Sequence, residues 1–130
     1  MNKITRIMLK IYKPVSGLDW LNYKITRKKD LTFHHILKKI DGGTYDITNG
    51  AILMPTPHHY LHIIESVNFE TYQALNRMFK IINLQCYEPN NEQRDVIEHL
   101  LRTFEKRHEF DRTSKGKRLI KYEFTQRGYR

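Results

Sequence analysis

Five of the seven histidines in this chain lie between residues 34 and 62. His34 and His35 are adjacent, while His58 and His62 stand four residues apart. Side chains with that spacing share one face of a helix, where two imidazoles can bind a single cation. Imidazole is also the usual proton carrier near neutral pH. These residues therefore indicate metal binding or proton transfer as the chemistry of this segment.

Two strands and a helix are expected to position these histidines. Residues 31–37 are short and rich in strand formers, and residues 50–54 are predicted to form the returning strand. A helix is predicted to follow over residues 57–67. Thr56 is its expected N-cap, and Pro57 suits the first helical position.

The rest of the chain is expected to be mostly helical. The other predicted elements are a helix or strand over residues 4–12, helices over 69–84 and 91–110, and a final strand over 119–124. Asn68 is placed to cap the first of these long helices. Asn90 followed by Gln93 resembles a capping box at the start of the second.

The histidines, together with Asn49, resemble the HNH (His-Me finger, ββα-metal) endonuclease motif over about residues 31–66. Fourteen residues separate His35 from Asn49, nine separate Asn49 from His58, and four separate His58 from His62. The resemblance implies an α+β fold, in which a ββα-metal finger is braced by additional α-helices and flanked by basic N- and C-terminal extensions.

The resemblance also implies a role for each residue. His34, His58 and His62 correspond to the metal ligands. His35 corresponds to the general base that takes a proton from water, and Asn49 to the residue that pins the loop and helps to orient that base. Neighbouring residues of a strand point to opposite faces, so we expect the chain to bend where the strand passes into the loop beside His34 and His35.

The types of the predicted ligands indicate which metal is expected, and the cysteine count indicates how the finger is supported. One divalent ion is expected, and three histidines without a carboxylate favour Zn²⁺, Ni²⁺ or Mn²⁺ over Mg²⁺. Asp46 and Asp30 are the nearest acids and could enter the outer shell. Cys86 is the only cysteine, so a Cys-x-x-Cys zinc clamp is excluded. We therefore expect a single domain (1–130), with a core over 31–66, supporting helices over 68–110 and a basic extension over 111–130.

Charge is divided unevenly along the chain. The net charge of +9 consists of +6 in residues 1–30, −3 in residues 31–100 and +6 in residues 101–130. Basic flanks around a histidine-rich centre favour a polyanion such as DNA as the partner, although for any one lysine solvated surface is the better explanation. The expected phosphate contacts are Arg27, Lys28, Lys29, Lys38, Lys39, Lys115, Lys117, Arg118 and Lys121.

The sequence therefore predicts a small metal-dependent HNH endonuclease that hydrolyses DNA, of a kind suited to a phage or mobile element. The alternatives are a non-catalytic, metal-braced nucleic-acid-binding module, an RNA-cleaving relative, or an inhibitor that engages a nucleoprotein partner. No membrane partner is expected, because the apolar runs are too short to span a bilayer. The lone cysteine fits a reducing, cytoplasmic setting. An apolar face on the 91–110 helix would indicate a homodimer if exposed, and core if buried.

Overall fold

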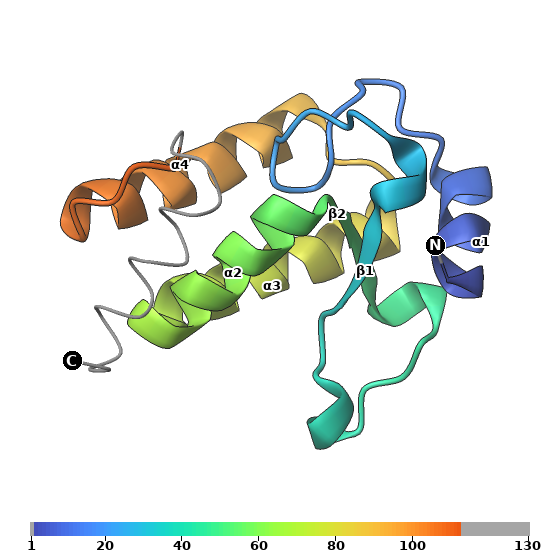
Figure 1. Cartoon of the computed structure of the whole chain (residues 1–130), viewed down its shortest axis with the longest axis horizontal. Helices are drawn as coiled ribbons and strands as arrows, with labels where there is room; N and C mark the ends of the chain where they lie inside the picture. The colour runs from blue at the N-terminus through green and yellow to red at the C-terminus, as the bar shows by residue number, and fades with distance from the viewer. Residues whose placement is uncertain (1, 113–130) are drawn as a thin grey trace.

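The computed structural model describes residues 2–112 of the 130-residue chain. Their elements, in chain order, are α1 (Lys3–Tyr12), η1 (Lys28–Asp30), β1 (Thr32–His35), η2 (Lys39–Asp41), η3 (Ile47–Asn49), β2 (Gly50–Leu53), α2 (Pro55–Val67), α3 (Phe69–Gln85) and α4 (Asn91–Arg107) (Figure 1). The mixture of helix with one antiparallel strand pair confirms the α+β class. The predicted strand over 119–124 lies outside the described residues.

A short antiparallel hairpin lies at the centre of the fold. β1 pairs with β2 so that His34 faces Ala51 and His35 faces Gly50. Every residue of β2 is buried. α3 contacts β2, and α1 contacts β1, so the hairpin lies between α1 and the α2–α3 pair (Figure 1). The hairpin is therefore held firmly enough to fix the position of a side chain on β1.

Capping residues explain where the helices begin. Asn68 accepts a hydrogen bond from the backbone N–H of Thr71, which confirms its role as the cap of α3. Asn90 and Gln93 form the predicted capping box of α4. Residues 3–12, whose type the sequence left open, are helical, and the Asn2 side chain caps them.

The predicted start of α2 is wrong by two residues. The helix begins at Pro55, so the N-cap is Met54 and not Thr56. Proline lacks a backbone N–H group and suits a first helical position, so Pro55 serves as well as Pro57. The backbone N–H of Met54 donates to the buried carboxylate of Asp19, at 2.9 Å. This contact with a distant residue fixes the entry to α2.

The apolar faces of α2, α3 and α4 meet in one core. The face of α4 that could have served a homodimer contributes Ile97, Leu101 and Phe104, all of them buried. This face is therefore core. Trp20, the only tryptophan, is also buried, and its ring lies 6.2 Å from that of Phe79 on α3. Among the described residues, no helix combines the length and apolar character needed to cross a bilayer.

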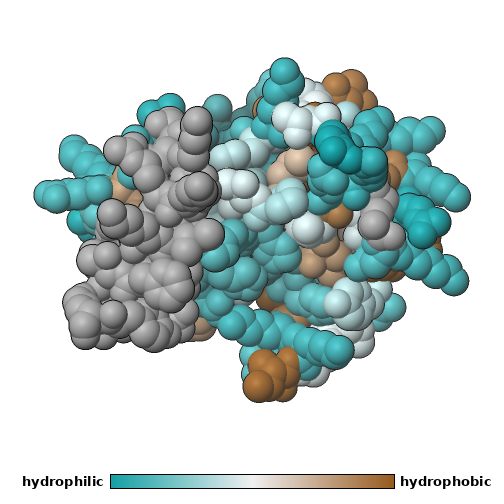
Figure 2. Space-filling view, in the orientation of Figure 1, coloured by the Kyte–Doolittle hydropathy of each residue, from teal (hydrophilic) through white to brown (hydrophobic). Residues whose placement is uncertain are grey.

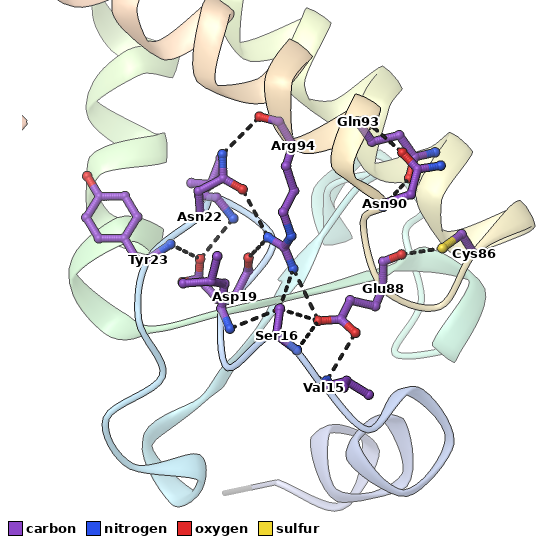
Figure 3. Close-up of polar contacts among 12 residues, drawn as sticks. Val15, Ser16, Asp19, Asn22, Tyr23, Cys86, Glu88, Asn90, Gln93 and Arg94 are labelled. Carbon is purple, nitrogen blue, oxygen red and sulfur yellow. Dashed lines mark hydrogen bonds and ion pairs between the residues drawn. The ribbon is translucent and has the colours of Figure 1, made fainter.

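A network of hydrogen bonds and an ion pair around Arg94 and Glu88, here called the polar latch, connects the segment after α1 to the start of α4 (Figure 3). The guanidinium of Arg94 donates to the backbone carbonyl of Asp19 at 2.9 Å and to the hydroxyl of Ser16 at 3.0 Å. It also forms an ion pair with Glu88 at 3.3 Å. The carboxylate of Glu88 in turn accepts the backbone N–H groups of Val15 and Ser16. The latch therefore holds irregular chain against the helices without a strand or disulfide.

Candidate metal centre

Three histidines from two elements converge beside the hairpin. His34 comes from β1, while His58 and His62 lie one turn apart on α2. Each offers one ring nitrogen, and the three nitrogens lie within 4.8 Å of one another. His34 is buried, and the other two are partly exposed. The structure thus brings together the three residues predicted as metal ligands, in a cluster that could hold one ion.

The surroundings of His34 aim its ring at α2. Its partner across the hairpin is Ala51, whose small side chain is fully buried. The rings of Tyr72 and Phe79 on α3 stand edge-on to the imidazole, with centroids at 6.2 and 5.8 Å. Packing on three sides therefore fixes the orientation of this imidazole.

A hydrogen bond decides which nitrogen His34 presents. Its Nε2 lies 2.8 Å from the amide oxygen Oδ1 of Asn76 on α3. An amide oxygen only accepts, so Nε2 carries the hydrogen and donates it. The lone pair of the neutral ring is then on Nδ1.

Hydrogen bonds also determine which ring nitrogen carries the hydrogen in the two histidines of α2. The hydroxyl of Thr32 donates to the carbonyl of Leu53 at 2.7 Å, so it accepts from Nδ1 of His58, also at 2.7 Å. Nδ1 of His62 lies 3.1 Å from a carboxylate oxygen of Glu65 and donates to it. In the neutral form of each ring, the lone pair is then on Nε2. An outer shell of acceptors that fixes each imidazole is typical of metal-binding histidines.

Burial favours the neutral form of two of the three histidines. Desolvation, together with the neighbouring imidazoles, lowers the pKa of His34 to about 3, although the hydrogen bond with Asn76 acts in the opposite direction. The pKa of His58 falls to about 4 for the same two reasons. Metals bind the neutral form of imidazole, so these two side chains are ready to bind at neutral pH without losing a proton.

His35 lies beside the cluster and faces the same pocket. The pocket lining includes His34, His35, His58, His62, Lys38 and Lys39. His35 is the last residue of β1, and the chain bends at residues 36 and 37, where the sequence predicted a bend. The His35 ring lies edge-on to Phe33 and Tyr45, with centroids at 4.9 and 4.3 Å.

The electrostatic setting of His35 also favours a neutral ring. Burial and the charge of Lys39 both lower its pKa. Its Nε2 is buried and has no hydrogen-bond partner among residues 2–112. Unpaired buried polar atoms are rare in folded proteins, and they often mark a place that a ligand or water completes.

Asn49 fastens the loop that joins the two strands. Its Oδ1 accepts the backbone N–H of Leu37 at 2.8 Å. Its Nδ2 donates to the carbonyl of Leu37 at 3.0 Å and to that of Thr44 at 2.9 Å. These bonds join the two ends of loop 36–49 directly beyond His35. The predicted loop-pinning role is therefore what its contacts perform.

The predicted phosphate contacts fall into three groups. Lys38 and Lys39 border the pocket, and Lys38 forms an ion pair with Glu65. Arg27, Lys28 and Lys29 are exposed around η1, at the opposite end of β1 from His35 (Figure 1). The remaining four, Lys115, Lys117, Arg118 and Lys121, lie outside the described residues.

The sequence did not predict which side chains hydrogen-bond to the three predicted metal ligands. The predicted acids lie elsewhere: Asp30 forms an ion pair with Arg27, and Asp46 accepts the hydroxyl of Thr44. The carboxylate that contacts a predicted ligand is Glu65, three residues after His62 on α2. That spacing is a signal that could have found it, because such residues are neighbours on a helix.

Comparison of the chain with protein-family models, with curated proteins and with solved structures found no match in any of the three. Its function is therefore inferred from its own residues. They supply three ring nitrogens within 4.8 Å of one another, a fourth imidazole beside them, and lysines at the edge of the same pocket.

Proposed function

We propose that this chain is a metal-dependent endonuclease of the HNH type that hydrolyses phosphodiester bonds in DNA. One observation supports this above all others. His34, His58 and His62 each place one ring nitrogen within 4.8 Å of the other two, and one nitrogen of each ring is hydrogen-bonded to an acceptor. Packing alone does not require three such arrangements around one centre.

The donor set fits a borderline divalent metal. Three imidazole nitrogens suit Zn²⁺, Ni²⁺ or Mn²⁺ better than Mg²⁺, which prefers oxygen ligands. When bound, such an ion neutralises charge on a phosphate oxygen and stabilises the departing oxygen. The contribution of the chain is to favour neutral His34 and His58 by burial and to hold the three rings through Asn76, Thr32 and Glu65.

His35 is assigned the proton transfer. A neutral imidazole can take a proton from water as that water attacks phosphorus. The packing of its ring against Phe33 and Tyr45 limits its motion, and Asn49 steadies the loop that follows it. Lys39 is exposed at the edge of the pocket, where its charge favours an approaching phosphate.

Replacement of His35 tests the proposal. We expect His35→Ala to abolish nicking of supercoiled plasmid in Mn²⁺, Ni²⁺, Zn²⁺ and Mg²⁺, with unchanged circular dichroism and unchanged salt-sensitive DNA binding. His99→Ala is the matched control, because His99 is exposed on α4. Nicking by His35→Ala at the wild-type rate would refute the assignment.

Parallel digests of plasmid, single-stranded DNA and RNA distinguish the alternatives. Cleavage of RNA alone would make the chain a ribonuclease with the same site. Salt-sensitive DNA binding without cleavage in any of the four metals would instead assign the finger to a binding module.

A further inference from the structure

Loop 36–49 presents one large apolar side chain almost wholly to solvent beside the candidate metal centre. Ile40 lies in η2 at the tip of the loop, and 89% of it is exposed. It also lines the pocket that contains the four histidines. Figure 2 shows apolar surface at the lower edge of the molecule, where Figure 1 places this loop, with hydrophilic surface around it. Ile40 therefore contributes almost nothing to the core.

The loop that carries Ile40 is tightly held. Asn49 bonds both backbone groups of Leu37 and the carbonyl of Thr44. The backbone N–H of Gly43 donates to the carbonyl of Lys38 at 2.8 Å, and any Cβ atom at Gly43 would overlap the carbonyl of Leu37. The ion pair of Lys38 with Glu65 ties the same loop to α2. The exposure of Ile40 is thus built into the loop.

We propose that Ile40 is a wedge that inserts between two stacked base pairs of duplex DNA next to the phosphate to be cut. This inference rests on the proposed function. Proteins that bend DNA commonly insert Ile, Leu, Met or Phe between base steps, which unstacks the step and kinks the duplex. A kink beside the pocket opens the backbone toward the histidines at the point where Ile40 enters.

The surroundings of Ile40 favour DNA over a protein partner. Lys39 adjoins it and is exposed, and its contact is with the ring of Tyr45 at 6.0 Å. Lys38 precedes it, whereas Asp41 is the one acid in η2. Protein interfaces use contiguous apolar patches. The other exposed large hydrophobic side chains of this loop, Leu37 and Tyr45, are each only 50% exposed, and the Tyr45 ring packs against Phe33 and His35. A single projecting wedge beside the exposed Lys39 is therefore the better fit.

Base unstacking can be measured directly. Cut positions are first mapped with the wild-type protein on a duplex. 2-Aminopurine, whose fluorescence rises when it unstacks, is then placed at the cut step of an uncleaved duplex bound by His35→Ala protein. We expect a rise of fluorescence with Ile40 present and none when Ile40→Ser is added to that protein. Val15→Ser is the matched control, because Val15 is 90% exposed on another loop, and it should behave like the parent.

Cleavage provides a second readout. In the otherwise wild-type protein, Ile40→Ser should lower the rate on a matched duplex by about tenfold. Its rate should recover on a duplex with a mismatch at the cut step, where the bases are already loosened. Equal fluorescence and equal rates for Ile40→Ser and wild type would overturn the wedge while leaving the nuclease intact. Loss of self-association in Ile40→Ser, with unchanged fluorescence, would assign Ile40 to a protein contact instead. If the wild type cuts nothing, the proposed function fails and the wedge fails with it.

Discussion

At the scale of single residues, the candidate centre depends on side chains that do not themselves bind the ion. An imidazole can present either nitrogen, and it rotates freely unless something holds it. Here Asn76 selects the tautomer of His34, as Thr32 does for His58. Such contacts raise affinity by removing the wrong tautomers and orientations before the ion arrives.

Replacement of Asn76 tests whether the hydrogen bond to His34 raises metal affinity. We expect Asn76→Ala to weaken Zn²⁺ binding by roughly 10- to 100-fold, because the tautomer and orientation of His34 are no longer fixed. Asn76→Asp keeps an acceptor at the same place and should restore most of the affinity. Isothermal titration of each variant with Zn²⁺ measures the effect. The control is Gln73→Ala, one turn earlier on α3 and exposed. Equal affinities for Asn76→Ala and wild type would remove Asn76 from the outer shell.

At the scale of elements, the entry to α2 depends on one buried carboxylate. Asp19 accepts the backbone N–H groups of Leu21, Tyr23 and Met54. Burial raises its pKa to about 6, although these bonds and the charge of Arg94 act in the opposite direction. The folded state therefore holds the proton of this carboxyl more tightly than the unfolded chain, where its pKa is about 3.9.

The sign of the pH dependence follows from that order of pKa values. The stabilisation linked to this proton is present below about pH 4 and is lost as the pH rises through about 6. Asp19→Asn cannot titrate, so the free energy of unfolding of the wild type minus that of Asp19→Asn should fall by about 2 kcal/mol between about pH 4 and pH 7. Urea unfolding of both proteins measures it, and groups common to both cancel. A difference that is constant or rises with pH would contradict this prediction.

The sequence predicted the helix starts that depend on local contacts, but not the contacts between residues far apart in the chain. Local signals succeeded where the deciding contact is local: Asn68, Asn90 and Gln93 cap the helix that each precedes or begins. The spacing of His58 and His62, one helical turn apart, is a local pattern of the same kind. Asn76, in contrast, is 42 positions beyond His34, and no local pattern connects them. The misplaced start of α2 has the same cause, because the anchor of Met54 lies 35 positions earlier.

At the scale of the whole molecule, metal binding and folding should be linked. The three nitrogens of the candidate centre come from β1 and α2 and meet only when the hairpin packs against that helix. An ion that binds the folded chain at 100 times its dissociation constant adds about 2.7 kcal/mol of stability. For a domain of this size that corresponds to a rise in Tm of roughly 10 °C.

Thermal unfolding with and without Zn²⁺ tests that linkage. We expect the wild type and His99→Ala to show the full rise in Tm, because His99 lies apart from the cluster on α4. His62→Ala should lose most of the rise. It is the ligand to replace, since its partly exposed side chain can be removed without a buried cavity. A rise of equal size in His62→Ala would place the ion elsewhere.

The position of Trp20 gives the protein an optical reporter of its own. This single indole is buried against Phe79. The Phe79 ring also contacts the ring of His34, with the two centroids 5.8 Å apart. Emission from the unlabelled chain is therefore sensitive to events within two aromatic rings of the histidine cluster. Ni²⁺, which quenches indole at short range, should dim that emission as it binds, so occupancy can be followed in the cuvette where the melting curve is recorded.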